Sequence, residues 1–192
     1  MRTWTADASV CFLGALLLLT LPLRWLLAAV IAAVIHELSH MLAVRLLGGT
    51  IMGVTIGPGG AVMETTPFSR GKELVCALAG PVGSLLLLSL CRWIPRIALC
   101  AGVQALYNLL PVYPLDGGRV LHCAAGLVLP ERTAGTVCRG IEGAVIFGIF
   151  LLSAAAALVW HWGLMPLLMA FVLLWKKNTL QTNANRGTIG LP

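Results

Sequence analysis

One apolar stretch of the chain, VIHELSHMLA at residues 34–43, contains three side chains that could do chemistry. His36 and His40 are four residues apart, so on a helix they project from one face, within reach of a single metal ion. Glu37 lies between them, where a carboxylate can accept a proton from metal-bound water. Ionisable groups are costly in an apolar segment, which indicates that these three serve a function.

A catalytic zinc ion needs a third protein ligand and one position open to water. The chain has only two aspartates, and Asp116 stands in the segment NLLPVYPLDGGR. Pro111 and Pro114 cannot continue a regular helix, so we expect them to unwind the chain and let Asp116 turn inward. The two glycines that follow Asp116 permit close backbone approach. Asn108, eight residues earlier, could donate a hydrogen bond to a substrate carbonyl or a developing oxyanion.

The composition indicates what surrounds these residues. The chain has 192 residues, 59% hydrophobic and 10% charged, whereas a soluble domain carries about 25% charged residues. With a mean hydropathy of +0.94, the chain is expected to lie in a lipid bilayer. The formal charge of +6 does not indicate a nucleic-acid partner, because the basic residues do not cluster. Six scattered cysteines without a CxxC pair predict neither a disulfide framework nor a thiolate metal site.

The elements that must position the site follow from the charge-poor stretches. We predict an all-α polytopic membrane protein of about six transmembrane helices, with a small β-hairpin between the second and third. The hairpin is expected because two β-branched stretches flank the turn GPGG, and a short helix is expected just after LDGG. The predicted spans are 8–23, 25–47, 74–91, 97–115 and a helical hairpin over 143–175 that turns near residues 162–163; the strands are 51–56 and 61–66, and the short helix is 119–129.

The basic residues predict the orientation of these spans. Ten of the thirteen Lys and Arg residues fall on one side, which the positive-inside rule assigns to the cytoplasm. Both termini are then cytoplasmic, residues 1–177 form one membrane core with its hairpin at about 50–66, and residues 178–192 form a polar cytoplasmic tail. The second and fourth spans run in the same direction, so the histidine motif and Asp116 come to a similar depth. Glu64, Glu73, Glu131 and Glu142 lie near predicted span ends and are expected to be solvated. His122 and His161 lie outside the motif, where interfacial packing or a turn explains them.

HELSH in an early span, followed two spans later by NLLPVYPLDGG, resembles the site-2 protease family of intramembrane zinc metalloproteases. The intervening ELVCALAGPVGS is similar to a third motif of that family, except that Ser84 stands where Asn is frequent. Ser39 likewise stands where Gly is frequent. No segment between the predicted spans is long enough for a PDZ domain, and the tail is too short for a CBS domain. The chain therefore resembles the compact sporulation-type branch.

The resemblance implies a zinc metalloendopeptidase that hydrolyses a peptide bond in or near the transmembrane segment of a membrane-protein substrate. It implies one Zn²⁺ per chain, held by His36, His40 and Asp116, with Glu37 as general base and Asn108 as a substrate-positioning residue. The implied partners are a membrane-spanning protein substrate, the lipid bilayer and a membrane-borne regulator or inhibitor. The implied location is the bacterial cytoplasmic membrane.

Two other functions remain open at this stage. One is a catalytically inactive membrane scaffold of the same fold, although such a scaffold would have no use for the base Glu37. The other is a divalent-metal transporter, which should carry polar groups along several spans and not at one depth only. For an enzyme, the predicted hairpin offers a strand edge on which an extended substrate could pair, because exposed backbone groups in an apolar setting need partners.

Overall fold

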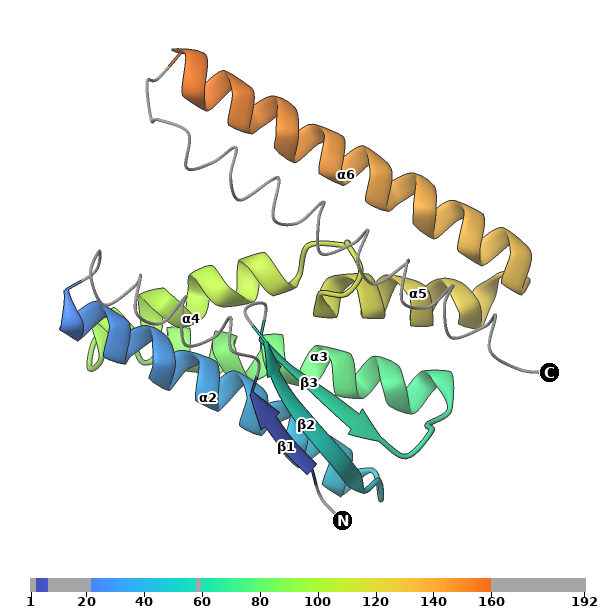
Figure 1. Cartoon of the computed structure of the whole chain (residues 1–192), viewed down its shortest axis with the longest axis horizontal. Coiled ribbons are helices and arrows are strands. Elements are labelled where there is room, and N and C mark those ends of the chain that lie inside the picture. Colours follow the sequence, from blue (N-terminus) through green and yellow to red (C-terminus); the bar gives the residue numbers. More distant parts are fainter. Residues whose placement is uncertain (1–2, 7–21, 58–59, 160–192) are drawn as a thin grey trace.

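The structure is a computed structural model that describes residues 3–6, 22–57 and 60–159 (Figure 1). The described part of the chain is mostly helical and has one small sheet. Its elements are, in chain order, β1 (Thr3–Ala6), α2 (Leu23–Leu46), β2 (Ile51–Gly57), β3 (Gly60–Thr65), α3 (Arg70–Ser89), α4 (Pro95–Asn108), α5 (Asp116–Val128) and α6 (Glu131–Val159).

Three of the described helices, α2, α3 and α6, are long and apolar enough to cross a membrane. Their candidate membrane spans are Leu23–Leu46, Arg70–Ser89 and Glu131–Ala155. The other predicted spans are not confirmed. Helix α4 has 14 residues, so it is about 21 Å long and shorter than a hydrocarbon core of about 30 Å. The first predicted span lies almost wholly outside the described residues, as do the predicted turn at 162–163 and the polar tail. Helix α6 begins at Glu131, twelve residues before the span that was predicted there.

The predicted hairpin is confirmed, since β2 and β3 pair antiparallel with Ile56 opposite Ala61 and Gly57 opposite Gly60. The structure adds a strand that the sequence did not predict. Strand β1 pairs parallel to β2, so the order in the sheet is β1-β2-β3 and β2 is the central strand. Of the two hairpin strands, only β3 is therefore left with an outer edge among the described residues.

The break between α4 and α5 lies where the two prolines predict it. Helix α4 ends at Asn108, and the chain resumes a helix at Asp116, three residues before the predicted start of the short helix. The loop folds back onto the first turn of α5. A Cβ atom on Gly117 would lie 2.2 Å from the carbonyl oxygen of Leu109, and one on Gly118 would lie 2.4 Å from the amide nitrogen of Tyr113. Both glycines are needed for this approach, as expected.

Small residues bring the helices around the site close together. Ala32 of α2, with Ala98 and Ala101 of α4, are fully buried, and α3 packs against α2, α4 and α5 (Figure 1). Helix α6 packs against α5. The outer faces of the helices carry large exposed side chains such as Leu86, which suits contact with lipid tails and needs no further protein partner.

Candidate metal centre

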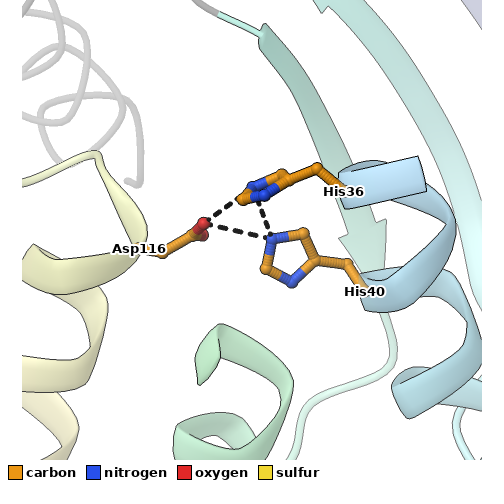
Figure 2. Close-up of side chains that lie close together, drawn as sticks. All are labelled: His36, His40 and Asp116. Atoms are coloured by element: carbon orange, nitrogen blue, oxygen red, sulfur yellow. Dashed lines mark hydrogen bonds and ion pairs between the residues drawn. The ribbon is translucent and has the colours of Figure 1, made fainter. Parts of the chain in front are cut away.

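Three buried side chains from two helices meet at one point (Figure 2). His36 and His40 lie on the buried face of α2, and Asp116 is the first residue of α5. Asp116 Oδ2 lies 3.0 Å from His36 Nε2 and 3.2 Å from His40 Nε2. The two Nε2 atoms are 3.3 Å apart. The helical spacing of the histidines is seen in the structure, and Asp116 lies beside them as expected, although the fourth membrane span from which its depth was predicted is not confirmed.

These distances fit a zinc ion. Four tetrahedral ligands at 2.0–2.1 Å from zinc have donor atoms about 3.3 Å apart, which is close to the separations of 3.0, 3.2 and 3.3 Å found here. Two imidazoles and one carboxylate leave the fourth position for water, as in catalytic zinc sites. Among the described residues, this is the one group of His, Cys, Asp and Glu whose ligand atoms could hold a metal.

The outer nitrogens of the two histidines are also held. His40 Nδ1 lies 2.7 Å from the carbonyl oxygen of Cys76, and His36 Nδ1 lies 2.9 Å from Ser84 Oγ. A carbonyl oxygen can only accept, so His40 Nδ1 carries the proton and the Nε2 of a neutral His40 presents a lone pair. That lone pair faces the Asp116 carboxylate and His36 Nε2. A cation at this point would be coordinated by these lone pairs, which otherwise repel one another. Hydrogen bonds at the Nδ1 atoms, like those to Cys76 and Ser84, orient histidines that bind a metal through Nε2.

Asp116 is held in its ionised form. Burial by itself would raise the pKa of its carboxyl group, but in the absence of a metal, hydrogen bonds donated by the protonated forms of His36 and His40 outweigh burial and lower this pKa to about 2. Its position in the first turn of α5 acts in the same direction, because the amino end of a helix favours negative charge. A carboxyl group must lose its proton to bind a metal, so Asp116 is ready to do so at neutral pH.

Helix α3 closes the site from a third side. A Cβ atom on Gly80 would lie 2.1 Å from His40 Nε2 and 2.7 Å from His36 Nε2, and one on Gly83 would lie 2.0 Å from Ser39 Oγ. Any larger residue at position 80 would therefore enter the space of the ligand atoms. The segment GPVGS thus contributes in two ways. Gly80 leaves room for the imidazoles of His36 and His40, and Ser84, which is fully buried, contacts His36.

The structure places the two predicted catalytic residues on the elements expected for them. Asn108 ends α4, and its Nδ2 lies 3.2 Å from His36 Nε2. Glu37 follows His36 on α2 and is half-buried, so it is less enclosed by the protein than either histidine. Sequence reasoning missed Ser84 and the carbonyl of Cys76. The family-like motif around Ser84 was a usable signal, whereas a backbone carbonyl leaves no trace in a sequence.

No family model matches the chain, and no curated protein matches it. A search of solved structures finds a site-2 protease from Methanocaldococcus jannaschii, with a TM-score of 0.60 and 18% sequence identity over 80% of this chain and 75% of that one. The chain has the site-2 protease fold. At this identity the likeness concerns the fold alone. It nevertheless supports the resemblance seen in HELSH and LDGG, because those motifs and the backbone similarity are separate observations.

Proposed function

We propose that the chain is an intramembrane zinc metalloprotease that cleaves membrane-protein substrates. The observation that carries this proposal is the meeting of His36, His40 and Asp116 at zinc-like distances within a site-2 protease fold. Glu37 stands beside two of these ligands on the same helix. A purely structural zinc site would have no use for a carboxylate at that position.

The chain's own residues would share the work of peptide hydrolysis. When bound, zinc would supply an activated water and polarise the scissile carbonyl. Glu37 would accept the proton from the attacking water and pass it to the leaving amine. Asn108 would donate a hydrogen bond from its side-chain amide to the carbonyl oxygen, where negative charge develops. Ser84 and the carbonyl of Cys76 would keep the two imidazole rings aimed at the reacting centre.

The substrate would be presented as an extended strand. A helical peptide bond is shielded by its own hydrogen bonds, whereas an extended segment needs partners for its N–H and C=O groups. The edge of β3 would supply them by strand addition. The sequence did not decide which of the two hairpin strands would pair with the substrate. Strand β2 is paired on both sides, so β3 is the strand proposed to bind the substrate.

The setting of the enzyme is proposed from the charge distribution. Both termini and the open side of the site would face the cytoplasm of a bacterial cell, and residues 1–177 would form one membrane core followed by a polar tail. A membrane-spanning protein would be the substrate, and a membrane-borne inhibitor or regulator would be a further partner.

The Glu37→Gln variant tests this proposal. Each purified protein would be reconstituted in liposomes, loaded with zinc and assayed for cleavage of tagged single-span membrane proteins. We expect cleavage by the variant to fall by ~10²–10⁴-fold, because the general base is lost, while zinc content stays at one ion per chain. The matched control is Glu131→Gln, which makes the same substitution on a different helix, α6, at a side chain that is 84% exposed.

The outcomes separate the enzyme from its two rivals. Loss of cleavage with zinc retained supports the metalloprotease. Cleavage within about tenfold of the parent contradicts the role of Glu37. A parent protein that binds zinc and cleaves none of a broad substrate library favours the scaffold, and zinc flux across the liposome membrane favours the transporter.

A further inference from the structure

Glu142 is a buried carboxyl group that the proposed chemistry does not use. It is 3% exposed and lies on α6, one of the helices long and apolar enough to span a membrane. The sequence predicted a solvated side chain at this position, and that prediction is wrong. Burying a carboxyl group is costly unless it is hydrogen-bonded, and such a group within a membrane helix indicates a function.

The contacts of Glu142 bracket the third metal ligand. Its Oε1 lies 3.2 Å from the backbone nitrogen of Tyr113, which donates a hydrogen bond to it. The same oxygen lies 2.9 Å from His122 Nε2. Tyr113 comes three residues before Asp116 and His122 comes six residues after it. One carboxylate oxygen on α6 therefore holds the chain on both sides of Asp116.

The loop is rigidly connected to the first turn of α5. A Cβ atom on Gly118 would lie 2.4 Å from the backbone nitrogen of Tyr113 and 2.6 Å from the carbonyl oxygen of Val112. The backbone that Glu142 contacts is thus packed directly against the turn that begins with Asp116. A shift of Tyr113 must move that turn, and with it the Asp116 carboxylate.

The cavity beside His122 does not indicate that His122 and Glu142 bind a ligand there. A cavity of about 350 Å³ lies between α3, α5 and α6, and His122 is on its wall. Its other charged groups are already paired, Arg70 with Glu131 and Arg119 with Glu73. No unpaired charge on its described walls would select an ionic ligand. These two ion pairs instead join α3 to α6 and α3 to α5.

We propose that Glu142 is a positioning residue of the metal centre. By holding Tyr113 and His122, it sets the position of Asp116 relative to His36 and His40 and so tunes the affinity of the site for its metal. This inference rests on the proposed zinc centre. It assigns a function to α6, which contributes none of the three ligands.

Metal binding by the full chain in detergent tests the inference without requiring a substrate. Zinc affinity would be measured by competition with a chromophoric chelator, and site geometry by the visible absorption of the cobalt-substituted protein. Glu142→Leu removes the acceptor of both hydrogen bonds, and we expect zinc affinity to fall about 10–100-fold, with a changed cobalt spectrum. Glu142→Gln keeps a side-chain oxygen that can accept two hydrogen bonds, so we expect it to restore affinity to within about threefold of the parent.

Two further variants complete the design. Glu131→Gln, on the same helix, removes a carboxylate whose partner is Arg70 of α3, and it should leave affinity and spectrum unchanged. His122→Leu removes only one of the two contacts at a half-exposed side chain and should weaken zinc binding by a smaller factor, about threefold to tenfold. This variant decides the question if Glu142→Leu does not fold.

The inference is overturned if folded Glu142→Leu binds zinc with the parent's affinity and cobalt spectrum, or if His122→Leu does so where Glu142→Leu cannot be obtained. It is also overturned if Glu142→Gln is as defective as Glu142→Leu. A parent protein that binds no zinc or cobalt contradicts the proposed metal centre itself, and this result is distinct from the others.

Discussion

Replacing Gly80 with alanine places one methyl group against His36 and His40, the two imidazoles of the proposed metal centre. The added Cβ would lie 2.1 Å from His40 Nε2 and 2.7 Å from both His36 Nε2 and His40 Cδ2. The neighbouring atoms belong to rings rather than to the end of a flexible side chain. Both rings are held at their outer nitrogens by Ser84 and the carbonyl of Cys76, so neither can turn away without losing a hydrogen bond.

The size of the effect follows from these distances. Ordinary contact between a methyl carbon and a ring nitrogen is about 3.4 Å, so His40 Nε2 and position 80 must separate by about 1.3 Å beyond the 2.1 Å available. A zinc site tolerates errors in ligand distance of about 0.2 Å. Helix α3 cannot retreat freely, because Ser84 on the same helix contacts His36. We therefore expect zinc affinity to fall at least about 100-fold, equivalent to about 2.7 kcal/mol, and proteolysis to fall with it.

The assay would compare zinc affinity and metal content of Gly80→Ala with those of the parent and of Gly71→Ala. Gly71 lies on the same helix, and a Cβ there meets nothing within 4 Å. Because alanine favours a helix over glycine, Gly71→Ala should be at least as stable as the parent and bind zinc equally well. Folded Gly80→Ala with zinc affinity within about threefold of the parent would refute the close approach of α3 to the ligands.

Two more predictions follow from the site and the sheet. Asp116→Ala should leave two imidazole ligands and reduce zinc content well below one ion per chain, measured by atomic emission, whereas parent-like content would mean that Asp116 is not the third ligand. Proline placed singly at Ala61, Val62, Met63 and Glu64 should impair cleavage wherever it removes an N–H from the outer edge of β3, with zinc content unchanged. Full cleavage by all four folded, zinc-loaded variants would show that the hairpin only connects α2 to α3.

Local features of the chain allowed much of the site to be predicted. The spacing of His36 and His40 places them on one helical face whatever surrounds that helix, so the structure agrees. Pro111 and Pro114 end a helix for steric reasons that act within a few residues, and α4 does end before them. The turn GPGG predicted the β2–β3 pair for the same kind of reason.

Long-range pairing was harder to predict. Strand β1 pairs with a strand about fifty residues away, and its four residues contain no feature that predicts which strand it pairs with. Ser84 contacts His36 across 48 positions of sequence, and its role was visible only as a departure from a family-like motif. The start of α6 was misplaced because Arg132, Arg139 and Glu142 suggested a polar connection, whereas these residues continue the helix.

The sequence by itself determined which side chains could bind a metal and activate water, because residue type and helical spacing are local properties. It also indicated Asp116, through a topology constrained by charge and membrane thickness. Only the tertiary structure decided how the site is held. Gly80 lies directly against the imidazoles of His36 and His40, and Glu142 is buried against Tyr113 and His122. The sequence around a glutamate near the start of an apolar stretch does not indicate whether its side chain is exposed or buried. Glu142 is buried because α6 packs against α5.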